Sequence, residues 1–140
     1  MAEFKMQMQS FQKKPVADFV KDLSSKSSKM DTGSCSAAVA AMSFAFLFRA
    51  CSFADVTGNE ELAYIARNCE NLSNYMVQLV DEDIKCRAPI TIAMMEKSQD
   101  KIDACLQPAC AINAEIINMM LKALEFAKSL KFIVPDEAKQ

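Results

Sequence analysis

The chain has 140 residues, of which 51% are hydrophobic and 24% are charged, and its formal net charge is −2. This composition predicts one globular domain with a sizeable core and excludes an intrinsically disordered chain. The small acidic balance argues against a nucleic-acid-binding or anionic-membrane surface, and the polar N-terminus does not resemble a signal peptide. We therefore expect a cytoplasmic protein with neither a nucleic-acid nor a membrane partner.

The chain contains no histidine and six cysteines. The missing histidine excludes Ser-His-Asp and Cys-His catalysis, so a general acid or base must be a carboxylate, Lys, Tyr, Cys or the substrate itself. Because the cysteines form no Cys-x-x-Cys pair, we expect free buried thiols in a reducing compartment and no metal site.

The chain order predicts a flexible segment at residues 1–14, a single helical domain at 15–134 and a C-terminal tail at 135–140. Pro15 is suited to the first turn of a helix, where its missing N–H is not needed. A first helix is expected to follow it and to end in a serine-rich stretch. Spacing of i, i+3, i+4 and i+7 predicts its buried face: Val16, Phe19, Val20 and Leu23.

A polar turn at residues 29–34 leads into a second helix, which should begin near residues 34–36. Serine hydroxyls can cap the free N–H groups of a helix start. A turn containing Gly33 presents such groups in a way that suits an anion. The second helix is apolar nearly all round, which is typical of a central helix. Its longest apolar stretch, residues 37–48, is too short to span a bilayer.

A third helix is predicted from Glu60 to Arg87, because Pro89 should stop it. Asp83 continues the apolar stripe of this helix, where a purely structural helix would carry a hydrophobic residue. Asp81 lies two residues earlier and therefore points in a different direction. The stripe comprises residues at helical spacing: Leu62, Ile65, Ala66, Cys69, Leu72, Met76, Leu79, Val80 and Asp83.

A fourth helix is predicted from about Ser98 to Leu130, with a kink or a break at Pro108. The segment 90–95 before it is helical or irregular. No period-2 alternation persists, so the fold class is all-α, a bundle of four to five helices. The expected buried face of the fourth helix is Ile102, Cys105, Leu106, Ala109, Ile112, Ile116, Met120, Leu124 and Ala127.

Four short motifs follow one another in a set order. They are Phe19-Val20-x-x-Leu23-Ser24-Ser25, Gly33-Ser34-Cys35-Ser36-Ala37-Ala38, Leu79-Val80-Asp81-Glu82-Asp83 and Ala104-Cys105-Leu106-Gln107-Pro108. In order and spacing this set, over roughly residues 15 to 130, resembles the cyclodeaminase domain of the formiminotransferase-cyclodeaminase family. The resemblance implies an all-helical bundle that forms a homodimer.

The resemblance also implies an activity in one-carbon metabolism. These enzymes act on 5-formiminotetrahydrofolate, close the ring to 5,10-methenyltetrahydrofolate and release ammonia, and some relatives are methenyltetrahydrofolate cyclohydrolases. The implied ligand is a tetrahydrofolate derivative as substrate, with no metal. Asp83 is the expected catalytic carboxylic acid, with Asp81 as a second candidate. The implied substrate-binding residues lie at the turn: Thr32, Gly33, Ser34 and Ser36.

Alternatives remain open at each position. Asp83 is equally a capping or ion-pairing carboxylate, and the Gly33 turn is equally an ordinary helix start. The family carries prolines and consecutive glycines where this chain has Lys29, Met30, Asp31 and Thr32. A non-catalytic helical module for binding or assembly, derived from the same family, is therefore the alternative function.

Overall fold

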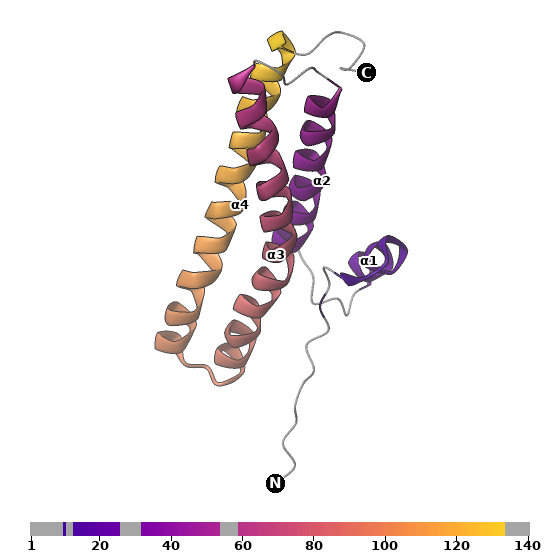
Figure 1. Ribbon diagram of the computed structural model, residues 1–140. Coiled ribbons are helices and arrows are strands. Elements are labelled where there is room, and N and C mark those ends of the chain that lie inside the picture. The colour runs from indigo at the N-terminus through magenta and orange to yellow at the C-terminus, as the bar shows by residue number, and fades with distance from the viewer. Residues whose placement is uncertain (1–9, 11–12, 26–31, 54–58, 134–140) are drawn as a thin grey trace.

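The computed structural model describes residues 10, 13–25, 32–53 and 59–133. Within these ranges the chain forms helices and no strand, which confirms the predicted all-α bundle (Figure 1). The expected C-terminal tail, the end of the serine-rich stretch and the turn at 29–31 lie outside the described residues. The helices are α1 (Val16–Leu23), α2 (Thr32–Ser52), α3 (Glu60–Met95) and α4 (Gln99–Ile133).

The two longest helices, α3 and α4, form an antiparallel hairpin against which α2 packs (Figure 1). With 21 residues against 36 and 35, α2 covers only part of the hairpin's length. The start of α2 lies beside the middle of α3, and its end lies near the start of α3. The short helix α1 is set to one side of the bundle, and its predicted buried face is wrong. Val16 and Val20 are 79% and 57% exposed, and only Phe19 packs, partly buried, against the core. The first turn of α2 therefore meets the midpoint of the hairpin.

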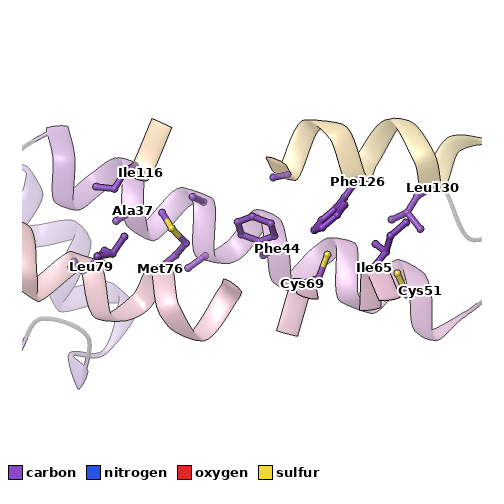
Figure 2. Packing of buried hydrophobic residues seen from close by; sticks show 14 of the residues in the cluster. Ala37, Phe44, Cys51, Ile65, Cys69, Met76, Leu79, Ile116, Phe126 and Leu130 are labelled. Atoms are coloured by element: carbon purple, nitrogen blue, oxygen red, sulfur yellow. The ribbon is translucent and has the colours of Figure 1, made fainter. Parts of the chain in front are cut away.

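The core runs along the contact of α2, α3 and α4 (Figure 2). Phe44 is fully buried at its centre, and small alanines on the same face of α2 allow the helices to approach closely. The predicted stripe of α3 is confirmed, since its apolar members are buried or packed against the core. Other buried members include Ala37, Ala40, Ala41, Cys51, Ile65, Cys69, Met76, Ile116, Phe126 and Leu130.

The prediction that α3 stops at Pro89 is wrong, because the helix continues to Met95. Pro89 is exposed, so water can satisfy the carbonyl that loses its helix donor. Ala93, one turn later, is 3% exposed, and its burial holds the extension against the hairpin. Similarly, α4 continues through Pro108 without a break.

The C-terminus of α3 is closed by a paired hydrogen-bond motif with a lysine in the left-handed position. The amide of Lys97 donates to the carbonyl of Met94 at 3.1 Å, and that of Ser98 donates to Ala93 at 3.3 Å. Lys97 has a φ of 55°, a conformation that glycine adopts without steric cost.

Lys97→Gly is therefore expected to raise the free energy of unfolding by about 1 kcal/mol, because it relieves this strain. Chemical denaturation measures the difference. Lys97→Ala is the control, since it removes the charge but keeps the strain and should give no gain. Equal stability of the glycine and alanine variants would contradict the explanation.

The buried face of α4 is partly different from the predicted one. Ile116 is buried as expected, but Met120 and Leu124 are 38% and 60% exposed. After Ile116, apolar residues occur at both i+3 and i+4, Met119 and Met120, so the pattern alone did not fix the register. The core-facing residues of the second half are Ala123, Phe126 and Leu130.

By length and composition, α2 is also long and apolar enough to cross a membrane. The core helix of a water-soluble bundle meets the same two criteria. Only one face of α2 packs on α3 and α4. The predicted central position, with contacts on several sides, is therefore wrong for the single chain, because Met42, Phe46 and Phe53 on the other face are exposed.

Candidate functional site

The carboxylate of Asp83 is fully buried in α3 and is held by two side chains. Ser34 of α2 donates its Oγ–H to Asp83 Oδ2 at 2.7 Å. Arg87 of α3 donates its Nε–H to Asp83 Oδ1 at 3.2 Å. The Asp83 side chain has no exposed surface, whereas that of Arg87 is 35% exposed. A buried carboxylate is therefore linked to a cation that reaches the surface.

Local helix geometry explains this arrangement. Residues four apart lie one above the other on a helix, so Arg87 reaches Asp83 one turn earlier. Ser34 was expected near the helix start as a cap, but α2 already includes Thr32. The Ser34 hydroxyl instead donates to a side chain of α3, and Ser34 is completely buried. Its function in the fold is to pair with Asp83.

Gly33 permits the close approach of α2 to the other two helices. A Cβ at this position would lie 2.5 Å from Asp83 Oδ1 and 2.7 Å from Asn113 Oδ1. Because Gly33 lies inside a helix, the backbone conformation does not require glycine, but the space does. The prediction that Gly33 belongs to a turn before the helix is wrong, because α2 begins at Thr32, and the structure gives Gly33 a packing role instead.

An open cavity of about 300 Å³ lies between the start of α2, Arg87 of α3 and the middle of α4. Arg87 supplies a positive charge, and none of the lining residues that the structure describes carries a carboxylate. Asp83 lies directly behind this wall, because Gly33, Asn113 and Arg87, which surround its carboxylate, all line the cavity. The lining residues are Thr32, Gly33, Ser36, Arg87, Asn113, Ile116, Ile117 and Met120.

The structure brings together most of the residues predicted as a site. Thr32, Gly33 and Ser36 line the cavity, and Ser34 and Asp83 form the layer behind it. Each role in catalysis or binding stays a prediction.

Asp81 is placed elsewhere. Ser10 donates its Oγ–H to Asp81 Oδ2 at 2.6 Å, and Asp81 is 8% exposed. It is not among the residues that line the cavity, and it is buried where Ser10 contacts it. The same bond attaches Ser10 of the segment predicted as flexible to the bundle.

Two polar residues of the cavity, Arg87 and Asn113, were not predicted from the sequence as site residues. The signal for Arg87 was present, since it lies four residues after Asp83 on the same helix. Asn113 gave no comparable signal, because its position against Gly33 depends on how α4 packs on α2.

Two of the other candidate acid–base groups, Cys69 and Tyr75, are held in their protonated forms. Burial raises the pKa of the Cys69 thiol to about 12. The hydrogen bond that Tyr75 donates to Glu115 at 2.6 Å, aided by burial, raises the pKa of Tyr75 to about 12. These groups are poor nucleophiles or bases near neutral pH, so a carboxylate is the stronger candidate.

All six cysteines are free thiols. Among the residues described, no cluster of three or more His, Cys, Asp or Glu side chains is placed to hold a metal ion.

Comparison with known proteins gives one result that bears on this site. The family model described as formiminotransferase-cyclodeaminase matches residues 15–139, which is most of the chain and includes every residue of the cavity. No curated protein and no solved structure gave a significant match. The extent of the family match is sufficient for assignment, and the chain belongs to the formiminotransferase-cyclodeaminase family.

Proposed function

We propose that this protein is a folate-dependent one-carbon enzyme that acts as a formiminotetrahydrofolate cyclodeaminase or a methenyltetrahydrofolate cyclohydrolase. The observation that carries the proposal is the fully buried Asp83 carboxylate behind the wall of a cavity, in a chain of this family. The proposed substrate is a tetrahydrofolate derivative, bound where Thr32, Gly33 and Ser36 line the cavity, with Ser34 behind them.

In the cyclodeaminase reaction, N10 of the substrate attacks the formimino carbon, the bond from that carbon to the terminal nitrogen breaks, and ammonia leaves. With the formimino group protonated as an amidinium (–CH=NH2+), the proton that N10 loses is the one that the leaving NH2 gains, and the products are NH3 and the methenyl cation. Asp83 is proposed to carry this proton. Its path to the cavity leads along Arg87, which lines the cavity and whose side chain is 35% exposed. Asp81, bonded to Ser10, has no such access.

Ligand binding is tested by isothermal titration calorimetry of the full chain with 5-formyltetrahydrofolate, a stable 5-substituted analogue. The melting temperature is measured with and without this ligand. Saturable binding at micromolar concentration is expected. An absence of heat and of any shift in melting temperature at high micromolar ligand would refute a folate site.

A second candidate function, a homodimeric assembly module, is favoured by the outer face of α2. On the side opposite its buried face, this helix exposes large apolar side chains at helical spacing. They form one continuous stripe, whereas the exposed apolar residues of an ordinary monomer are scattered singly. A twofold pairing would bury them against the same face of a second copy. The exposed residues are Val39, Met42, Phe46 and Phe53.

The assembly proposal is tested by sedimentation. The wild-type chain is expected to sediment as a dimer and the Phe46→Glu variant as a monomer with unchanged helix content. A wild-type chain that remains monomeric at high micromolar concentration would rule the dimer out. Dimerisation without folate binding would favour the module over the enzyme.

A further inference from the structure

We infer that Arg87 determines ligand specificity in the cavity by donating to a carbonyl oxygen of the ligand's ring, beside the reacting nitrogen. The inference rests on the proposed function, because it uses the proposed place of the reaction next to Asp83. It adds a residue and a recognised chemical group that neither the sequence pattern nor the family match assigns.

The charge of the cavity lining indicates which kind of ligand group would bind beside Arg87. Arg87 contributes a cation, and none of the lining residues described has a carboxylate. An arginine side chain has only donors, so the complementary ligand atom is an acceptor. Thr32, Ser36 and Asn113 add polar groups beside it, whereas Ile117 and Met120 form the apolar part of the wall. The lining therefore suits a flat ring with an acceptor on one edge.

The position of Asp83 indicates which edge of the ligand's ring faces Arg87. The Asp83 carboxylate accepts from Arg87 Nε at 3.2 Å, so it lies behind the wall at the point where Arg87 lines the cavity. A substrate nitrogen that exchanges its proton with Asp83 is therefore next to Arg87. In a reduced pterin, the carbonyl at C4 is attached to the ring carbon next to N5, the nitrogen that carries the formimino group. Arg87 is thus placed for this carbonyl.

The packing around Arg87 fixes its orientation. Asp83 is held on its other oxygen by Ser34 at 2.7 Å and cannot turn without breaking that bond. Asp83 in turn holds Nε of Arg87, so the planar guanidinium is oriented before the ligand arrives. A lysine at this position would keep the positive charge but would lack the planar guanidinium and the fixed directions of its N–H donors.

The experiment compares two ligands that differ only in this group. These are 5-formyltetrahydrofolate and its 4-amino-4-deoxy analogue, which replaces the carbonyl acceptor by an amino donor. Their dissociation constants are measured by calorimetry for the wild-type chain, Arg87→Gln, Arg87→Lys and Lys85→Gln. Lys85 is the matched control, because it is an exposed cation on the same helix, paired with Glu82 and outside the cavity lining.

The wild-type chain is expected to bind the carbonyl ligand at least about 10-fold more tightly than the amino analogue, as loss of a charged hydrogen bond predicts. Arg87→Gln should weaken the carbonyl ligand by about 10-fold or more and remove most of the discrimination. Arg87→Lys should restore it only in part, and Lys85→Gln should bind as the wild type does. Melting temperatures establish that each variant is folded.

Each remaining result overturns a distinct claim. If the wild type binds both ligands equally, or Arg87→Gln keeps the discrimination, the role of Arg87 is wrong and the folate site stands. If Arg87→Gln weakens the binding of both ligands by the same factor, Arg87 maintains the shape of the cavity but does not discriminate the carbonyl from the amino group. If the wild type binds neither ligand, the proposed function and this inference both fail.

Discussion

Replacing Asp83 by alanine is expected to lower the free energy of unfolding by about 2–4 kcal/mol, because it removes a buried group with two charge-assisted hydrogen bonds. Ser34 is completely buried and would lose its acceptor. The cost stays below that of a fully buried ion pair, because Arg87 is 35% exposed and water can solvate it. Urea denaturation measures the change.

The Asp83→Asn variant distinguishes the contribution of Asp83 to stability from its proposed contribution to turnover. The amide oxygen can still accept from Ser34, whereas the amide NH2 cannot accept from Arg87 Nε, so only part of the stability should survive. The amide can no longer carry a proton. Turnover of 5-formiminotetrahydrofolate is expected to fall by about 100-fold to 10,000-fold while 5-formyltetrahydrofolate still binds. Glu82→Gln, at an exposed carboxylate on the same turn, is the control and should keep full turnover. Unchanged turnover in Asp83→Asn would remove Asp83 from the mechanism.

Gly33→Ala is expected to lower the free energy of unfolding by about 1–2 kcal/mol, although alanine is the better helix former. The new Cβ would lie 2.5 Å from Asp83 Oδ1 and 2.8 Å from Asp83 Cγ. The Asp83 carboxylate cannot move away without weakening its bonds to Ser34 and Arg87. The steric cost therefore exceeds the gain in helix propensity.

A double-mutant cycle tests the cause of this loss. In the Asp83→Ala background the carboxylate is gone, and Asn113 is half-buried beside the cavity and can rotate. Gly33→Ala should then cost little, which gives a coupling energy of about 1–2 kcal/mol. Additive effects of the two substitutions would show that the clash with Asp83 is not the reason for the glycine.

The sequence carried enough information to select Asp83, because a carboxylate in an otherwise apolar helical stripe is visible without a structure. Its partners were harder to predict. Ser34 looked like a cap because hydroxyls favour helix starts, and its pairing depends on how α2 packs against α3. The same packing decides the position of Asn113 and the need for glycine at position 33, neither of which local patterns report.

The predicted end of α3 and the predicted buried face of α4 failed for different physical reasons. Pro89 was expected to end α3, but a proline on an exposed face loses only a bond that water can replace. The register of α4 was ambiguous because apolar residues lie on two of its faces. Leu124 was expected in the core and is exposed, whereas Ala123 is buried. With apolar residues on two faces of one helix, the pattern alone does not identify the face that packs in the core.

The most direct test of the central claim is the rate at which the purified chain converts 5-formiminotetrahydrofolate to 5,10-methenyltetrahydrofolate, followed by the absorbance of the product. The account predicts saturable turnover in the wild type, loss of at least about 100-fold in Asp83→Asn, and full turnover in Glu82→Gln. A well-folded wild-type chain that gives no product above the uncatalysed rate would contradict it.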